Sequence, residues 1–182
     1  MELNRTAILF SCIIAGPAFG QSTPAPPVQT LIQNGTVFDG VQKRGQRSVL
    51  IEGSRIAEVD YRGKLLLRMR VVDGRGRTLL PGLIDSHVHA YAGQDDALMF
   101  GVTTQLDMFS APEATRAVRA RMASGENTGM ADIFTSGILA TVPKGHGTEY
   151  GLPIPTLTKP EEADAWVAAR IAEGSDYIKN GQ

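Results

Sequence analysis

The alternation of strand-like and helix-like segments after Pro81-Gly82 constrains the fold more than any other feature of the chain. Apolar runs predict strands at 83–89, 103–109 and 132–136, the beginning of a fourth strand at 177–179, and a short helix at 95–100. Longer helices are predicted before and after the third strand. Repeated strand–helix units form a parallel sheet covered by helices, so an α/β fold is expected.

The two longer helices carry start and stop signals. Each begins at a pair with capping-box spacing and ends before a glycine; these residues are Ser110, Glu113 and Gly125, then Thr158, Glu161 and Gly174. The apolar residues expected to be buried are Ala114, Ala117, Val118 and Met122 in the first helix, and Ala163, Trp166, Val167 and Ile171 in the second.

Residues 30–82 consist of short β segments separated by turn residues, which predicts a small antiparallel β unit. Gly35 is expected to divide the first two segments, and Gly53-Ser54 is expected to form a hairpin turn. Gly74-Arg75-Gly76 is expected to form a later turn. Three prolines within 21–29 predict a stiff, extended linker before this unit.

The N-terminus, residues 1–20, has the pattern of a bacterial-type signal peptide. An apolar run of nine residues (7–15) is followed by the small-x-small cleavage site Ala18-Phe19-Gly20. The chain is therefore expected to be exported, to the periplasm or outside the cell. Nine apolar residues are too few for a membrane-spanning helix, so no stable span is expected after cleavage. Lipidation at Cys12, an apolar first strand and a misassigned start site are the alternatives.

Composition excludes several classes of function. There are 18 Lys and Arg residues against 19 Asp and Glu, so the net charge of −1 provides no broad basic face for a nucleic acid. The single cysteine, Cys12, excludes an internal disulfide framework and a zinc site built from cysteines.

The run Asp85-Ser86-His87-Val88-His89 carries the clearest chemical signal. Alternate side chains of a strand share a face, so Asp85, His87 and His89 are expected to project together. Two imidazoles spaced in this way can bind one cation. Two ordinary histidines at a strand end are the alternative.

Four motifs in the same region resemble the amidohydrolase superfamily, in particular its imidazolonepropionase-like and Xaa-Pro dipeptidase-like branch. They are GTVFDG (35–40), IEGSRI (51–56), DGRGR (73–77) and LPGLIDSHVH (80–89), and the resemblance extends over 30–182. It implies an incomplete (β/α)8 TIM-type barrel over 83–182, with about the first four strands present. Part of a small β-sandwich over 30–82 would precede it.

The resemblance also implies a metal-dependent hydrolase that cleaves carbon–nitrogen bonds of a small molecule or dipeptide with metal-activated water. His87 and His89 match the metal ligands of the first barrel strand, and Lys179 matches a lysine that is carbamylated in many members. One or two divalent ions, with zinc favoured, would be the cofactor. Asp85 is a candidate to orient an imidazole from behind, or a buried polar residue at the barrel floor.

Two further residues have two interpretations each. His146, in a loop rich in glycine and proline, is a candidate for substrate contact or an ordinary exposed histidine. Asp107, at the end of the second predicted barrel strand, supports the site or caps the next helix.

Only 100 residues follow Gly82, whereas a complete barrel takes about 250. The remaining family ligands and the catalytic aspartate would lie on later strands, so we expect a front portion of a longer protein that is inactive alone. The alternatives are a deaminase of the same superfamily and a short, non-catalytic binding module.

Overall fold

The computed structural model describes residues 28–90, 93–125 and 129–181. The predicted signal peptide and nearly all of the predicted linker lie outside these residues. The chain divides into two compact units, one comprising residues up to 37 together with 44–78, and the other comprising 38–43 and 79–182. Within the described ranges, no helix has both the length and the apolar character needed to cross a membrane.

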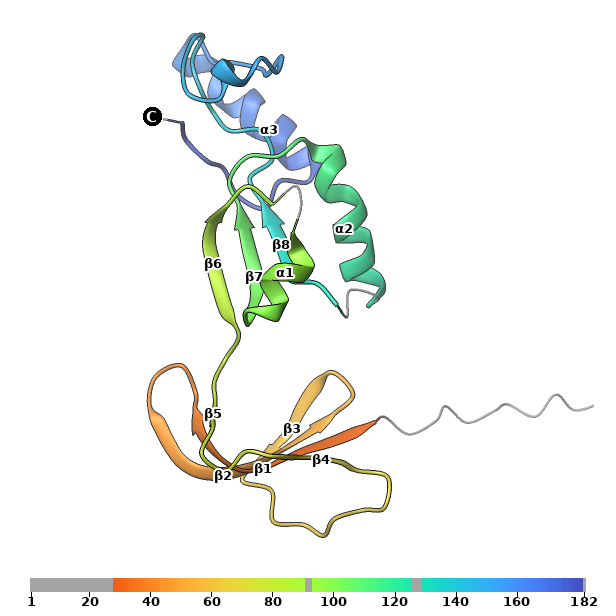
Figure 1. The fold of residues 1–182 in the computed structure, drawn as a ribbon. Helices are drawn as coiled ribbons and strands as arrows, with labels where there is room; N and C mark the ends of the chain where they lie inside the picture. Colours follow the sequence, from red (N-terminus) through yellow and green to blue (C-terminus); the bar gives the residue numbers. More distant parts are fainter. Residues whose placement is uncertain (1–27, 91–92, 126–128, 182) are drawn as a thin grey trace, which may run out of the picture. The chain divides into compact units, whose positions relative to one another are not determined.

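The first unit is a sheet with the strand order β3-β2-β1-β4, and the short β5 also pairs with β1 (Figure 1). Its strands are β1 (Gln29–Phe38), β2 (Lys43–Glu52), β3 (Arg55–Val59), β4 (Arg70–Asp73) and β5 (Thr78–Leu79). β2 and β3 form the antiparallel hairpin predicted at Gly53-Ser54, and Gly53 takes a positive φ of 59°. Its buried core consists of Leu31, Leu50 and Met69, with Tyr61 packed against them.

The prediction of a purely antiparallel β unit is wrong, because β4 pairs with β1 in parallel. The predicted break at Gly35 is also wrong, because β1 runs through it. The Gly74 N–H donates to the Gln33 carbonyl at 2.7 Å, and a Cβ at Gly74 would lie 2.9 Å from the Gly35 Cα. Two glycines therefore let the later turn approach β1 closely, and the strands on both sides of that turn pair with β1.

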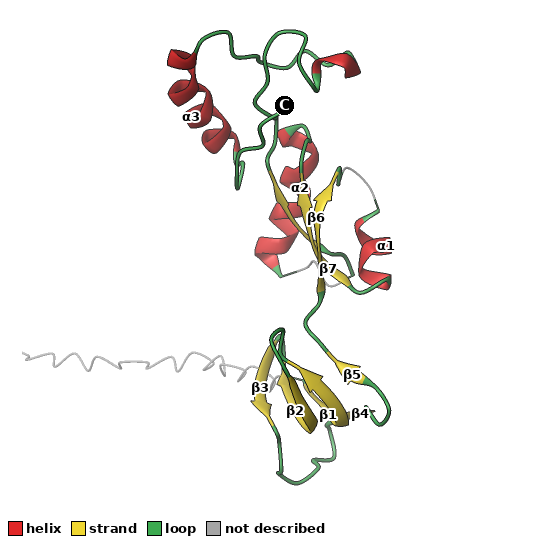
Figure 2. Ribbon diagram, turned by 90° about the vertical axis from the view of Figure 1, so that its left-hand side faces the viewer, coloured by secondary structure: helices red, strands yellow, loops and turns green. Residues whose placement is uncertain are grey.

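The second unit is built on a sheet in the order β6-β7-β8, in which both strand pairs are parallel. This confirms the three predicted strands and their direction. The strands are β6 (Leu83–Val88), β7 (Val102–Asp107) and β8 (Asp132–Thr135); the helices are α1 (Gln94–Met99), α2 (Pro112–Ser124) and α3 (Ala163–Glu173). All three strands point toward the end where the connection from β8 to α3 lies (Figures 1 and 2). That connection contains two 3-10 turns, η1 (Thr148–Tyr150) and η2 (Pro160–Glu162).

The predicted fourth strand at 177–179 is not formed. Asn180, the residue that follows this segment, instead makes an isolated parallel bridge with Ala140. The Asp176 carboxylate accepts the Thr135 N–H at 2.9 Å, and the Tyr177 hydroxyl, whose single hydrogen is shared with the Asp107 carbonyl, lies 3.0 Å from the Phe134 carbonyl. The Asp176 N–H also donates to the Thr135 carbonyl at 2.8 Å. These contacts, two of them from side chains, occupy backbone groups at the end of β8 with which a regular strand would pair.

The helices end at Gly125 and Gly174 as predicted, but neither predicted capping box is correct. Ala111 precedes the first turn of α2, because the Ser110 hydroxyl donates to the Asp107 carboxylate instead. Thr158 pairs with Glu162 rather than Glu161, since η2 shifts the register by one residue.

The buried helix faces also differ from the predicted stripes. In α2 the buried residues are Thr115 and Val118, while Ala114 and Ala117 are exposed. In α3 they are Trp166 and Arg170, while Ile171 is 63% exposed. The Arg170 guanidinium lies 4.9 Å from the centre of the Trp166 ring and pairs with Glu173, which lets a charged residue replace the expected aliphatic one. The core of this unit consists of Ala90, Val118 and Ile133, with Val88 and Met122 packed on it.

Candidate active site

The two predicted metal-ligating histidines lie together at the carboxyl end of β6. His87 is within the strand and His89 follows its last residue. Both are exposed, and their ring centres are 6.2 Å apart with an interplanar angle of 65°. The carboxyl ends of parallel strands are where α/β folds bind ligands. The structure therefore brings these two imidazoles together at a position suited to a site.

Asp85 contacts the backbone of this segment. Its Oδ1 accepts the His87 N–H at 3.2 Å, and the pairing register with β7 shifts between Asp85 and Val88. Asp85 is exposed at the surface of the described part of the chain. Its role in orienting an imidazole stays a prediction.

Asp107 is the most highly connected carboxylate near the histidines, and it is completely buried. It accepts the Ala90 N–H at 2.9 Å, the Ser110 hydroxyl at 2.8 Å and the Thr135 hydroxyl at 2.5 Å. These donors follow β6, follow β7 and end β8, respectively. A single side chain thus links the ends of all three strands, and it contacts the first of them at Ala90, the residue after His89. Of the two interpretations from the sequence, the contacts favour support of the site over a helix cap.

A row of aromatic rings extends from His89 to His146. The centre of the His89 ring lies 6.5 Å from that of Phe109, Phe109 lies 6.1 Å from Tyr150, and Tyr150 lies 6.0 Å from His146. The Nδ1 atom of His146 also lies 2.9 Å from Oε1 of Glu149. The backbone N–H of Glu149 donates to the Glu149 carboxyl, and His146 also hydrogen-bonds to it. Both contacts lower the pKa of Glu149. The structure therefore places His146 on the same side of the unit as the histidine pair, joined to it through two rings.

Phe109 and Tyr150 were missed by the sequence reasoning. For Phe109 the only signal was an aromatic residue placed two residues after a strand that ends in an acidic residue. Tyr150 lies in a long loop, where sequence periodicity gives no indication of contacts.

Lys179 lies in the segment that follows α3. Its carbonyl accepts the Ala140 N–H at 2.8 Å, and the side chain is partly buried. In the described parts of the chain, no hydrogen bond or ring contact joins Lys179 to His87 or His89. Its predicted role as a carbamylated ligand stays a prediction.

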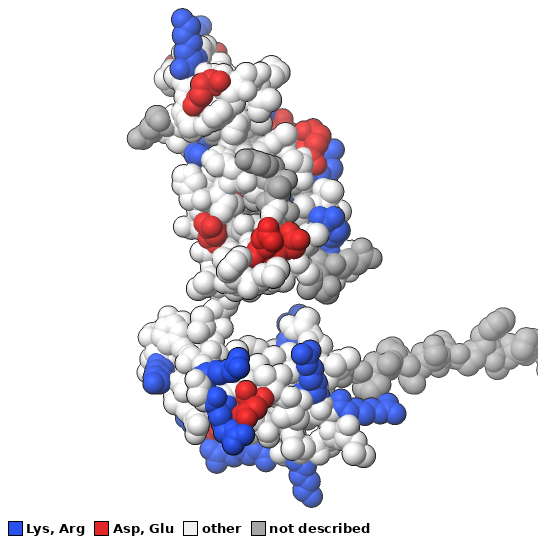
Figure 3. All heavy atoms as spheres, in the orientation of Figure 1, with Lys and Arg blue, Asp and Glu red and all other residues white. Residues whose placement is uncertain are grey.

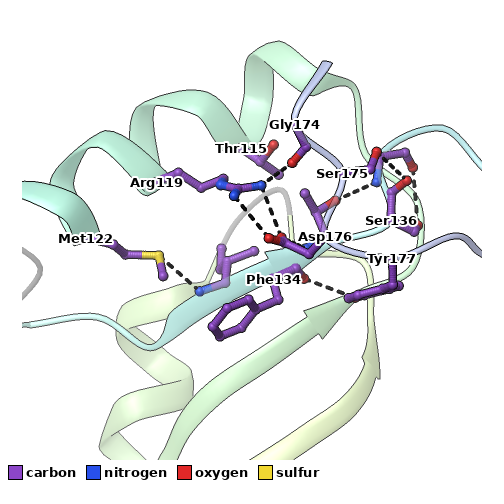
Figure 4. Close-up of polar contacts among 12 residues, drawn as sticks. Thr115, Arg119, Met122, Phe134, Ser136, Gly174, Ser175, Asp176 and Tyr177 are labelled. Atoms are coloured by element: carbon purple, nitrogen blue, oxygen red, sulfur yellow. Dashed lines mark hydrogen bonds and ion pairs between the residues drawn. The ribbon is translucent and has the colours of Figure 1, made fainter. Parts of the chain in front are cut away.

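A network of polar contacts anchors the start of the Lys179 segment (Figure 4). The Arg119 guanidinium reaches down from α2 and binds both carboxylate oxygens of Asp176, at 3.0 and 3.1 Å. The Ser175 hydroxyl donates to the Ser136 carbonyl at 2.9 Å. Burial, then the charges of Asp107 and Asp176, raise the pKa of Tyr177, so its phenol remains protonated and donates to the Asp107 carbonyl at 2.7 Å.

The donor chemistry of the site fits a divalent cation in part. Two exposed imidazoles at one strand end are the nitrogen ligands that zinc and similar ions take. Among the described residues, however, no group of three or more His, Cys, Asp or Glu side chains is placed to hold a metal ion. His87 and His89 therefore remain candidates for part of a ligand set, and their role as metal ligands stays a prediction.

The fold and the histidine pair agree with the resemblance to the amidohydrolase superfamily, and comparison with solved structures supports this resemblance. The similar structures include an Xaa-Pro dipeptidase with methionine bound in its active site, at 26% identity and a TM-score of 0.66 over 82% of this chain and 46% of that one. They also include molinate hydrolase (23% identity, TM-score 0.64, covering 85% and 45%) and a prolidase complexed with N-methylphosphonate-L-proline (23%, 0.64, 84% and 46%).

The similarity to the two structures at 23% identity is a similarity of fold alone. The chain spans less than half the length of each of these structures. No family model matches the chain. No curated protein matches it either.

Proposed function

We propose that this chain carries the first part of the active site of a metal-dependent hydrolase that cleaves carbon–nitrogen bonds. The observation that carries the proposal is the pair His87 and His89, with ring centres 6.2 Å apart at the carboxyl end of β6 in an amidohydrolase fold. In this proposal the three parallel strands and their helices are consecutive units of a (β/α)8 barrel. Export to the periplasm or beyond rests on the sequence of residues 1–20 alone.

Each residue of the site has a role that follows from its contacts. His87 and His89 would hold a divalent cation, with zinc as the first candidate. Asp85 would fix the His87 backbone, and Asp107 would fix the residue after His89. Lys179, in its carbamylated form, would complete the ligand set from this chain. The bound cation would supply Lewis acidity for hydrolysis.

The proposed substrate is a small neutral molecule with an amide-type bond, or a dipeptide. The solved structures that resemble the chain include a dipeptidase, a prolidase and molinate hydrolase. The described surface beside His89 is a cavity with mostly apolar walls, which suits a small organic substrate.

Metal binding by the full chain tests the proposal, with Zn²⁺ followed by titration calorimetry. His87→Ala and His89→Ala are each expected to weaken Zn²⁺ binding by about tenfold or more, a loss that can follow even from removing outer partners of a metal site. His146→Ala is the matched control, because it removes the third histidine and leaves the pair intact. Zn²⁺ affinity that survives loss of both His87 and His89 would overturn the proposal.

Hydrolysis is then assayed by release of amine from an Xaa-Pro dipeptide and from a simple anilide. Two proteins are compared: the chain of 182 residues, and a version extended through any downstream reading frame. Activity is expected in the extended protein only, because the general base is expected on a later strand. Zn²⁺ bound by an extended protein without any C–N hydrolysis would favour a binding function instead.

A further inference from the structure

A cavity of about 710 Å³ opens beside His89 in the second unit. It lies between the start of α2 and the loop that contains η1. The residues that decide its chemistry are Phe109 after β7, Ile138 after β8, and Tyr150, Leu152 and Ile154 in the loop. Its volume is within the range of about 300–1,000 Å³ typical of small-molecule sites.

Polar groups reach this cavity at few points. His89 lines it at the side of the histidine pair. Ser110 also lines it, but its hydroxyl already donates to the Asp107 carboxylate. Among the described residues of the wall, Glu113 is the one acidic residue, and its side chain is 74% exposed near Arg116. The greater part of the described wall is therefore aromatic and aliphatic, with the His89 imidazole and the Tyr150 hydroxyl as polar groups beside it.

The charge of the wall limits what can bind. Neither Lys nor Arg is among the described residues that line the cavity. An anionic group inside it would be desolvated without a cationic partner and would also face Glu113. An uncharged apolar group would instead gain by displacing water from the aromatic and aliphatic walls.

We propose that this cavity receives an uncharged aromatic or branched aliphatic group of the substrate, and that the polar bond to be cleaved faces His89. This inference rests on the proposed function, since it assigns the substrate's apolar group to the wall and its reacting end to the histidine pair. The cavity would then select neutral apolar substituents over charged ones. Tyr150 and Phe109, whose ring centres are 6.1 Å apart, would form the face on which a planar group stacks.

Two alanines on the exposed face of α2 provide a matched test. Ala114 lines the cavity, whereas Ala117, one turn further along the same helix, does not. Both side chains are exposed, so Ala114→Phe and Ala117→Phe carry a similar risk to folding. Ala114→Phe places a ring into the cavity mouth, and Ala117→Phe places the same ring outside it.

The probe is acetanilide, a neutral aromatic amide, added to the full chain without metal and followed by protein NMR shifts. Saturable binding is expected in the wild-type chain and in Ala117→Phe, and binding about tenfold weaker in Ala114→Phe. Acetamide, which lacks the ring, and benzoate, which is anionic, are expected to bind more weakly than acetanilide. Circular dichroism verifies that both variants are folded.

The result would overturn the inference if wild-type protein shows no saturable shift, if the two variants bind equally, or if benzoate binds as well as acetanilide. Because metal is absent, this outcome is independent of the Zn²⁺ titration of the histidine variants. If acetanilide binds but Zn²⁺ does not, the result supports an apolar binding pocket and rejects the proposed metal-dependent hydrolase. If Zn²⁺ binds but acetanilide does not, the result supports the metal site and rejects the proposed cavity.

Discussion

At the scale of single residues, Asp107 explains how the histidine segment is held. Its carboxylate accepts three hydrogen bonds from donors near the ends of β6, β7 and β8, and it has no exposed surface. Asp107→Asn keeps the shape but replaces one acceptor oxygen by an amide NH2 that faces donors. We expect it to lower the free energy of unfolding by about 1–3 kcal/mol, the cost of a buried donor left without a partner.

Urea denaturation of the full chain measures this change. Glu58→Gln is the control, because it also replaces a carboxylate by an amide but does so on the exposed strand β3. The control is expected to change stability by less than about 0.5 kcal/mol. Equal stability of Asp107→Asn and the wild type would show that the carboxylate does not hold the strand ends together.

At the scale of secondary-structure elements, the start of α3 is predicted to be sensitive to acid. The backbone N–H of Thr158, and then its hydroxyl, donate to Glu162 and lower the pKa of that carboxyl. A carboxyl whose pKa is lower in the folded state stabilises the fold above its unfolded pKa, about 4.3. That stabilisation is lost as the pH falls through the lower, folded pKa.

Glu162→Gln is therefore expected to lower the thermal midpoint at pH 7, and the difference from wild type is expected to shrink as the pH falls below about 4. Trp166 is the only tryptophan of the chain and lies in α3, so its fluorescence reports this element. Glu161→Gln is the matched control, since Thr158 bonds to the neighbouring Glu162. A pH-independent difference for Glu162→Gln would contradict the prediction.

The same elements show what the sequence can and cannot predict. Periodicity located β6, β7, β8 and the ends of both longer helices, because apolar runs and glycine stops act locally. It failed at Ser110 and Thr158, because capping depends on which acceptor lies nearby. The Ser110 hydroxyl donates to Asp107, and the Thr158 hydroxyl bonds to Glu162 because η2 changes the register by one residue. It failed again at Arg170, whose burial depends on the Trp166 ring and the Glu173 carboxylate packed against it.

The candidate site was likewise predicted from the sequence only in part. The spacing of His87 and His89 predicted a shared position, and the rings lie together. Nothing local in the sequence could show that Phe109 and Tyr150, separated by 41 positions, would line one cavity. That contact depends on how the connection after β8 folds over the strand ends, which is a tertiary property.

At the scale of the whole molecule, the net charge of −1 conceals a difference between the two units. Residues 44–78 contain nine Lys and Arg against four Asp and Glu, whereas 79–182 contain seven against thirteen. Figure 3 shows Lys and Arg side chains spread over the visible face of the β-sheet unit. The exclusion of nucleic acids was predicted from the average charge of the chain, and it stays a prediction.

The two units also have separate buried cores, which predicts separate unfolding. Leu31 belongs to the core of the first unit and Ile133 to that of the second; each is an aliphatic strand residue only 1% exposed. Truncation of either to alanine is expected to destabilise its own unit by about 2–5 kcal/mol through lost burial and the cavity left behind. Each variant should therefore shift one thermal transition and leave the other in place.

Scanning calorimetry of the full chain, with Leu31→Ala and Ile133→Ala measured beside the wild type, decides this. Trp166 fluorescence assigns one transition to the second unit, and Ile133→Ala should move that transition alone. A single transition shifted equally by both variants would mean that the units unfold as one cooperative body. In that case, the metal and cavity variants of the second unit would also have to be judged against the stability of the whole chain.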